Sequence, residues 1–125
     1  WPMVLVVDDD KVLRGLVSGL ARAAGCACEA LADGLEAVQW LRDHPPPDAI
    51  VADLLMPGLD GLSMVTAARR AGYDGAVILC TSVATDKLRA GAAQLQRAWT
   101  LDKATELYLV PEILRRAGVA PPLAA

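Results

Sequence analysis

The chain has 125 residues, 54% of them hydrophobic, and its formal net charge is −3. This length suits one domain with a packed core and is too short for two. The composition excludes a disordered chain, and the acidic balance argues against nucleic-acid binding, which requires a basic patch.

Membrane and secreted classes are also disfavoured. No apolar run approaches the roughly 18–20 residues of a membrane helix, and Trp1–Val4 lacks the basic region of a secretory signal. The three cysteines, Cys26, Cys28 and Cys80, are too few and odd in number for a disulfide framework. Two nearby thiols without further ligands do not complete a zinc site. We therefore expect a cytoplasmic protein in a reducing compartment.

The first strand and helix are predicted near the N-terminus. Met3–Val7 is a short, β-branched apolar run, typical of a buried parallel strand, and three aspartates follow it at residues 8–10. From Lys11, apolar residues recur at helical spacing, at Val12, Leu13, Leu16, Val17, Leu20 and Ala24. Asp10 is the expected N-cap of this helix, and Gly25 is expected to end it.

A weaker strand and a second helix follow. Residues 26–30 predict the strand, and residues 32–34 form a turn. The apolar face of the helix is expected to comprise Leu35, Val38 and Leu41, with Ala37 and Trp40 beside them. Prolines at 45–47 end this helix, because proline supplies no N–H and restricts the residue before it.

A continuous apolar run at Ala49–Leu54 surrounds a single carboxylate, Asp53, and breaks at Pro57-Gly58. Such a run between turn residues is typical of a strand in the middle of a parallel sheet. Asp53 then lies at the carboxyl end of this strand, where ligands bind in open α/β sheets.

The remaining elements repeat the alternation. Asp60 can cap a third helix, with Leu62, Val65, Ala68 and Ala71 inward and Gly72 at its end. A strand at Ala76–Cys80 ends beside Thr81, a helix is expected from about Ala84 to Leu95, and a strand at Ala98–Leu101 precedes Lys103. The last helix either covers residues 106–117 with a kink, or begins near Val110 with Pro111 at its first position.

Five strands alternating with five helices predict an α/β fold. The expected architecture is a flavodoxin-like (βα)5 domain, a doubly wound parallel sheet of order 2-1-3-4-5. We expect this domain to cover residues 1–118, and residues 119–125 to form a C-terminal tail or linker stub.

In that strand order, polar residues at the carboxyl ends of four strands converge. They are Asp8, Asp9, Asp53, Thr81 and Lys103. Three close carboxylates repel one another, and a divalent cation with oxygen ligands, best Mg²⁺, resolves the repulsion. A lysine and a hydroxyl suit a phosphoryl group, and no histidine lies near these strand ends. The set favours phosphoryl transfer to a carboxylate, although Asp53 alone is also compatible with a turn cap.

Five segments in order carry a family resemblance: residues 4–10 with Arg14, residues 32–37, residues 53–61, residues 79–81, and Lys103. Together they resemble the response-regulator receiver domain (CheY-like) of two-component signal transduction. The resemblance implies that Asp53 is the phosphoacceptor and Lys103 the phosphate-contacting lysine. It implies a switch hydroxyl at Thr81. Asp9 would bind Mg²⁺ directly, Asp8 through water, and Leu55 through its backbone carbonyl.

The resemblance also implies partners. A sensor histidine kinase or phosphotransfer protein would donate the phosphoryl group. An output domain or a second copy in a homodimer would bind the face of helix 4, strand 5 and helix 5. No direct nucleic-acid or membrane contact is expected. The alternative is a non-phosphorylated pseudo-receiver that acts as a protein-interaction module. We expect no enzyme activity beyond the domain's own phosphorylation, because aspartate-nucleophile phosphohydrolases usually carry a second carboxylate where Leu55 stands.

Several positions depart from the family pattern. Thr100 stands where an aromatic residue is usual, and Trp99 beside it should face the other side of its strand. Ala104 replaces the proline after the lysine, so a trans peptide is expected there. Gln96-Arg97 replaces a Gly-Ala pair, and Ser82 replaces a smaller residue. Leu55 and Val83 cannot orient a water, so we predict slow self-dephosphorylation, measurable as the decay of acetyl-phosphate-loaded protein.

Overall fold

A parallel five-stranded sheet of order β2-β1-β3-β4-β5 forms the centre of the computed structural model. The structure describes residues 1–82 and 86–123, with the backbone alone at Leu88. The strands are β1 (Met3–Val7), β2 (Ala27–Leu31), β3 (Ala49–Asp53), β4 (Ala76–Thr81) and β5 (Ala98–Asp102). The helices are α1 (Lys11–Ala23), α2 (Gly34–Asp43), α3 (Gly61–Arg70), α4 (Asp86–Ala93), the 3₁₀ turn η1 (Leu107–Leu109) and α5 (Val110–Arg116). The flavodoxin-like prediction is confirmed.

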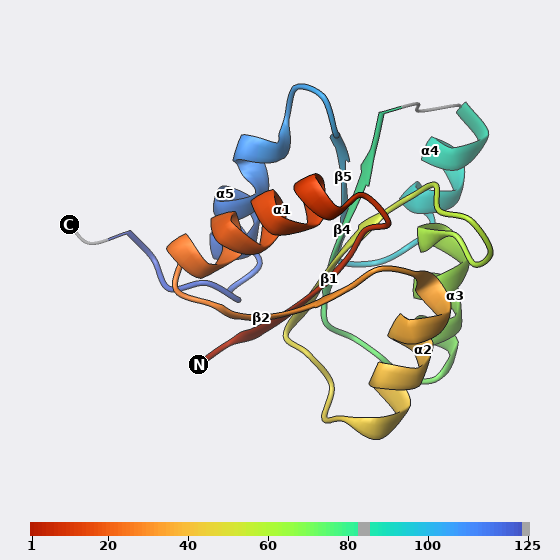
Figure 1. Cartoon of the computed structure of the whole chain (residues 1–125), viewed down its shortest axis with the longest axis horizontal. Coiled ribbons are helices and arrows are strands. Elements are labelled where there is room, and N and C mark those ends of the chain that lie inside the picture. Colours follow the sequence, from red (N-terminus) through yellow and green to blue (C-terminus); the bar gives the residue numbers. More distant parts are fainter. Residues whose placement is uncertain (83–85, 124–125) are drawn as a thin grey trace.

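Helices cover both faces of the sheet (Figure 1). One apolar cluster joins α1 and α5 to the sheet and includes Val6, Val51 and Ile78. The other lies under α2, α3 and α4 and includes Leu5, Ile50 and Leu79. Successive residues of the central strands therefore point into opposite cores, which explains their uninterrupted apolar sequences.

The sheet register brings the carboxyl ends of the strands to one edge. Val7 pairs with Ala52, Asp53 with Cys80, and Thr81 with Asp102. The residues that directly follow β1 and β5 therefore lie beside the last residues of β3 and β4. Side chains from four sequence-distant segments meet there.

The caps and helix ends agree well with the sequence. Asp10 and Asp60 cap α1 and α3 through their side chains. Gly25 and Gly72 follow these helices with φ of 99° and 100°, the left-handed region that glycine adopts without strain. Pro111 lies in the first turn of α5, so the second of the two expectations for the last helix is correct.

Three apolar residues assigned to buried helix faces are instead exposed. Val12 is 77%, Leu16 is 49% and Leu35 is 68% exposed. Val12 and Leu16 are one turn apart on a side of α1 that faces away from the core, and Leu35 lies in the first turn of α2. Helical spacing fixes which residues share a side, but not how wide the buried stripe is.

Other boundaries shift slightly. Ala71, expected inward, is the exposed C-cap residue of α3. The helix α4 ends at Ala93 rather than Leu95, and the expected start at Ala84 lies outside the described residues. β5 extends one residue further than expected, to Asp102.

The C-terminal segment remains packed for two residues beyond the expected boundary at 118. The N–H groups of Val119 and Ala120 both donate to the carbonyl of Leu114, at 2.9 and 3.0 Å. Ala120 is only 5% exposed and belongs to the core cluster on the α1 and α5 side. The division into residues 1–118 and a tail at 119–125 stays a prediction. Within the described residues, no helix is long and apolar enough to cross a membrane.

Candidate phosphoacceptor site

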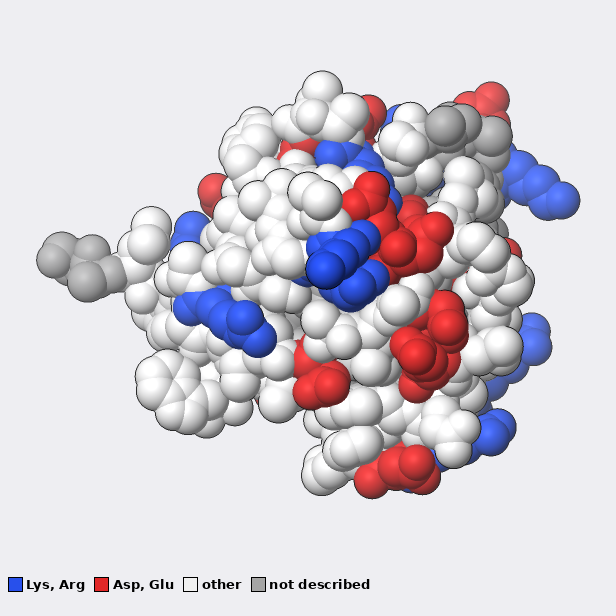
Figure 2. Space-filling view, viewed as in Figure 1, with Lys and Arg blue, Asp and Glu red and all other residues white. Residues whose placement is uncertain are grey.

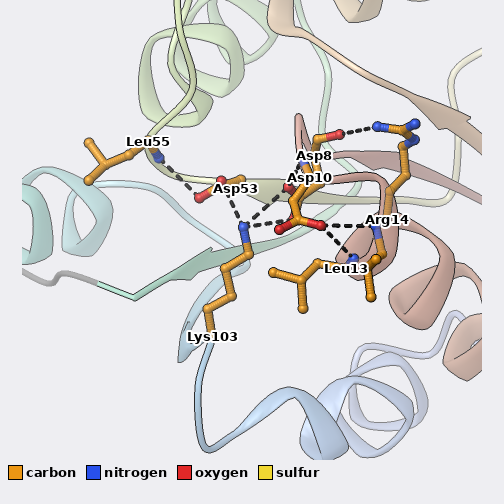
Figure 3. A network of polar contacts seen from close by, with 8 residues as sticks. Asp8, Asp10, Leu13, Arg14, Asp53, Leu55 and Lys103 are labelled. Atoms are coloured by element: carbon orange, nitrogen blue, oxygen red, sulfur yellow. Dashed lines mark hydrogen bonds and ion pairs between the residues drawn. The ribbon is translucent and has the colours of Figure 1, made fainter.

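Lys103 lies between two buried carboxylates at the carboxyl edge of the sheet (Figure 3). Its Nζ is 3.0 Å from Asp8 Oδ2 and 2.9 Å from Asp53 Oδ2. The three side chains are 10%, 5% and 8% exposed. The ammonium therefore bridges residues that lie 95 and 50 positions away in the chain.

The chain around Asp8 fixes its position through backbone and side-chain contacts. Asp8 Oδ1 accepts a hydrogen bond from the N–H of Asp10 at 2.8 Å, and Arg14 Nη1 donates to the carbonyl of Asp8 at 2.8 Å. Asp10 Oδ1 in turn accepts from the N–H groups of Val12 and Leu13, which holds the start of α1 (Figure 3). Asp10 is therefore a cap, as expected, and the carboxylate of Asp8 is turned toward Lys103.

Asp53 is the last residue of β3, and its surroundings hold the chain as it leaves the sheet. Its Oδ1 accepts from the N–H of Leu55 at 3.2 Å. The N–H of Leu54 donates to Cys80 at 2.7 Å, and the carbonyl of Leu54 accepts from Gly61 at 3.1 Å. These contacts fix the Asp53 carboxylate at the edge of the sheet.

The segment after β5 places Lys103 without the proline that is usual at the next position. The N–H of Lys103 donates to the carbonyl of Thr81 at 2.8 Å. Asp102 Oδ1 accepts from Ala104 at 2.8 Å and Thr105 at 3.2 Å, and Glu106 Oε1 accepts from the N–H of Asp102 at 2.9 Å. The Lys103–Ala104 peptide is trans, as expected. An aspartate-centred turn therefore fixes this loop.

Burial and the charges of the cluster oppose each other at this site. Desolvation raises the pKa of Asp53, although the hydrogen bond and charge of Lys103 lower it. For Lys103, desolvation lowers the pKa, but the hydrogen bonds and charges of Asp53 and Asp8 together outweigh it, so the net shift is upward. Burial and the neighbouring carboxylates raise the pKa of Cys80 to about 12, so its thiol stays protonated.

A family model of the response regulator receiver domain matches residues 4–114. The chain belongs to this family. The transcriptional regulatory protein PrrA of Mycobacterium tuberculosis is 39% identical over 116 residues, which is 92% of this chain and 48% of that protein. Response regulator MprA of Mycobacterium ulcerans is 35% identical over 79 residues, 63% of this chain and 34% of that protein. The chain thus spans about half, or less, of the length of these relatives.

Solved structures agree on the fold. Chemotaxis protein CheY4 of Vibrio cholerae superimposes with a TM-score of 0.82 at 25% identity, over 93% of this chain and 98% of that one. TrrA of Thermotoga maritima, solved in complex with Mg(2+)-BeF, gives a TM-score of 0.81 at 21% identity, over 94% of this chain and 99% of that one. This receiver domain therefore has the CheY-like architecture of two-component signalling proteins.

The donor set of this receiver domain fits a small divalent cation. Carboxylate oxygens of Asp8, Asp9 and Asp53 all lie within 4.8 Å of one another. Lys103 contacts two of these three groups, and Asp9 is exposed. Oxygen ligands of this kind, with room for water, suit Mg²⁺. The side chain of Leu55 is 47% exposed, and the metal-binding role of its carbonyl stays a prediction.

The residues on the two sides of β5 differ from the family pattern. Trp99 is half-buried and packs against the core cluster of α1 and α5, while Thr100 is exposed. Next to buried Thr81 lies a small cavity of about 30 Å³, lined by Thr81, Arg89, Thr100, Leu101, Asp102 and Glu106. Mostly polar side chains thus line the space beside Thr81, and the aromatic ring nearest in sequence lies on the other side of the strand. Val83, the second residue expected beside the phosphate, lies outside the described residues.

No function was predicted from the sequence for Arg14 or for Asp102. The first holds the backbone of Asp8, and the second forms the turn after β5. The signal for the turn was the aspartate two residues before Ala104, because aspartate side chains commonly accept from the N–H two residues onward. Arg14 offered no such signal, because an arginine in the first turns of a helix is ordinary.

The raised pKa of Asp53 leads to a stability prediction. In metal-free buffer at pH 7, Asp53→Asn should raise the free energy of unfolding by about 1 kcal/mol, because it removes a desolvated charge while Lys103 keeps Asp8 as a partner. A carboxyl whose folded pKa is raised destabilises the fold above that pKa, so the gain should shrink as the pH falls and vanish below about pH 4. Urea unfolding at several pH values measures this, with the exposed Asp43→Asn as control. A gain that persists at pH 3 would contradict the explanation.

Proposed function

We propose that Asp53 accepts a phosphoryl group from a phosphohistidine of a sensor histidine kinase or phosphotransfer protein. A carboxylate oxygen of Asp53 attacks phosphorus, and the P–N bond of the donor breaks. The electron pair of that bond stays on the imidazole, which takes up a proton from solvent. The observation that carries the proposal is the position of Lys103, whose Nζ lies within 3.0 Å of both the Asp53 and the Asp8 carboxylates.

The surrounding groups then have separate roles. The ammonium of Lys103 now contacts an oxygen of Asp53, and it would shift to an oxygen of the incoming phosphoryl group. The new contact would be a charge-assisted hydrogen bond. Asp9, Asp8 through water, Asp53 and the carbonyl of Leu55 would hold Mg²⁺. When bound, Mg²⁺ neutralises charge on the carboxylates and the phosphoryl oxygens. Thr81 would donate its hydroxyl to a phosphoryl oxygen, as the switch residue.

The expected consequence is a change on the face formed by α4, β5 and α5. The new charge on Asp53 would draw Thr81 and Lys103 inward and alter this face for an output domain or a second copy. PrrA is a transcriptional regulatory protein, and this chain covers 48% of it. Figure 2 shows basic and acidic side chains mixed over the drawn face, which supports the proposal that this face does not bind nucleic acid. The proposed place of action is the cytoplasm, where the phosphohistidine donor would be met.

Loading with acetyl phosphate or beryllofluoride in the presence of Mg²⁺ tests the function. We expect wild type to gain the mass of one phosphoryl group from acetyl phosphate, and Asp53→Asn to gain none. Removal of Mg²⁺ with a chelator should prevent the gain in wild type. Asp60→Asn is a matched control, because Asp60 caps α3 and should not be the acceptor. Modification of Asp53→Asn at the wild-type rate would overturn the assignment, and continuous release of phosphate would indicate a phosphohydrolase.

A second candidate function, a pseudo-receiver that binds partners without phosphorylation, is favoured by one observation. Trp99 packs on the α1 and α5 side of β5, and exposed Thr100 leaves the usual aromatic relay without a ring. If neither acetyl phosphate, nor beryllofluoride, nor a phosphorylated donor modifies wild type, the pseudo-receiver function is favoured over the phosphoacceptor function.

A further inference from the structure

A second polar site lies at the opposite end of the sheet from Asp53, where β4 and β5 begin. Arg69 of α3 and Arg97, just before β5, both border a hollow of about 430 Å³. The hollow is lined by Arg69, Gly72, Tyr73, Asp74, Gln94, Leu95, Gln96 and Arg97. This volume lies in the range of about 300–1,000 Å³ that small-molecule sites occupy.

Backbone carbonyls hold both guanidinium groups in place. Arg69 donates to the carbonyls of Tyr73 at 2.9 Å and Gln96 at 2.7 Å, and it lies over the ring of Tyr73 at 5.4 Å. Arg97 donates to the carbonyls of Asp74 and Ala117, both at 3.0 Å. A guanidinium has five N–H donors, so three remain on each after these bonds. The two forks are thus fixed before any ligand arrives.

The positive charge of this pair is not neutralised by a direct partner. Within residues 1–82 and 86–123, the ion pairs are those of Lys103 and of Arg116 with Glu112, and neither arginine takes part in one. Burial is the main reason that the pKa of Arg69 is lowered, and the charge of Arg97 contributes, whereas Tyr73 and Asp74 oppose the shift. The side chain of Asp74 is exposed and stands beyond ion-pair distance. Two adjacent cations without a carboxylate partner favour an anionic ligand.

The backbone of Arg97 is also unusual. It is the one non-glycine residue with positive φ in the described chain, at 51°. Glycine adopts this conformation without strain, whereas a residue with a Cβ does so at a cost. The hydrogen bonds that Arg97 donates to the carbonyls of Asp74 and Ala117 offset this cost and hold its guanidinium beside the hollow.

We propose that this hollow binds a small phosphate monoester with an apolar body. Two guanidinium forks that approach from α3 and from the start of β5 suit a tetrahedral dianion better than one flat carboxylate. Gln94 and Gln96 line the same hollow, and Tyr73 and Leu95 offer apolar surface for the body of the ligand. The site needs neither Asp53 nor a metal ion.

Phenyl phosphate tests the proposal, because it joins a phosphate to an apolar ring. We expect it to shift the Nε–Hε signals of Arg69 and Arg97 in a metal-free nitrogen–proton NMR titration. Arg97→Gly should remain folded, since glycine relieves the backbone strain, and should bind at least about tenfold more weakly through loss of charge-assisted bonds. Asp74→Asn should bind several-fold more tightly, because it removes the nearest negative charge.

Controls distinguish a specific binding site from nonspecific attraction of the anion to positive charge. Arg70→Gln removes an exposed arginine of α3 that does not line the hollow, and it should keep wild-type affinity within about twofold. Phenol tests the ring without the phosphate, and inorganic phosphate tests the phosphate without the ring. Both should bind more weakly than phenyl phosphate. Equal binding of phenol, wild-type affinity in folded Arg97→Gly, or no shift of either arginine would each overturn the proposal.

Discussion

Lys103→Met should slow phosphorylation of Asp53 by acetyl phosphate by about 10²–10³-fold, because it removes a fixed positive charge aimed at the phosphoryl group. It should also lower the metal-free free energy of unfolding at pH 7 by about 2–4 kcal/mol. The variant leaves Asp8 and Asp53 buried, 5% and 8% exposed, without the ammonium that now bridges them. Rates of phosphoprotein formation and urea unfolding measure the two effects.

Added Mg²⁺ should restore part of the stability of Lys103→Met, because a cation on the three carboxylates replaces the missing charge. Acid should do the same. The pKa of Asp53 is already raised by burial and rises further without Lys103, so stability should increase as the pH falls through that pKa. Wild type should show the same trend with a smaller amplitude, because Lys103 offsets part of the rise in the pKa of Asp53.

The exposed Lys87→Met on α4 is the matched control, with the same change of side chain at a lysine that forms no ion pair with Asp8 or Asp53. It should leave both the rate and the unfolding free energy close to wild type. If Lys103→Met is phosphorylated at the wild-type rate, Lys103 does not contact the phosphoryl group. If its stability does not respond to Mg²⁺, the carboxylates do not act as one cation site.

The central strands and their terminal aspartates could be predicted because two local rules agree there. Uninterrupted apolar runs such as Ala49–Ala52 occur where both faces of a strand are buried, and the structure buries every residue of β3. Parallel strands then bring their carboxyl ends to one edge of the sheet, independently of the conformation of the loops. Asp8, Asp53 and Lys103 could therefore be placed together before any contact between them was known.

The helix surfaces could be predicted less well, since their exposure depends on what packs against them. The spacing of Val12 and Leu16 fits a buried face, yet the sheet contacts α1 through other residues, among them Val17 and Ala21. The arginines at the other end of the sheet could not be predicted at all. Their contacts run to backbone carbonyls 27 and 20 residues away, and a side chain that binds backbone leaves no complementary residue type in the sequence.

Close packing at one glycine couples the position of α3 to the position of Asp53. Gly61, the first residue of α3, lies against the end of β3. A Cβ at this position would overlap the carbonyl oxygen of Asp53 and would lie 3.0 Å from its carbonyl carbon and 3.2 Å from the Cα of Leu54. All three are backbone atoms, which cannot turn aside as a flexible side chain does. An added methyl group must therefore displace α3 or the end of β3.

Gly61→Ala should lower the free energy of unfolding by about 2–4 kcal/mol, because overpacking against backbone forces the helix and the strand apart. Phosphorylation of Asp53 should slow by at least about tenfold, since small displacements of a reacting group are costly. Urea unfolding and acetyl-phosphate loading measure these effects on the same preparation.

Gly19→Ala provides the contrast, because a Cβ at Gly19 in α1 would meet no atom within 4 Å. It should stabilise the domain by about 0.5–1 kcal/mol, the ordinary gain of alanine over glycine within a helix, and leave phosphorylation unchanged. The two variants make the same chemical change with opposite expected signs. A stabilised Gly61→Ala variant with wild-type loading would show that the end of β3 can yield without moving Asp53, and that the close approach of α3 does not fix the phosphoacceptor.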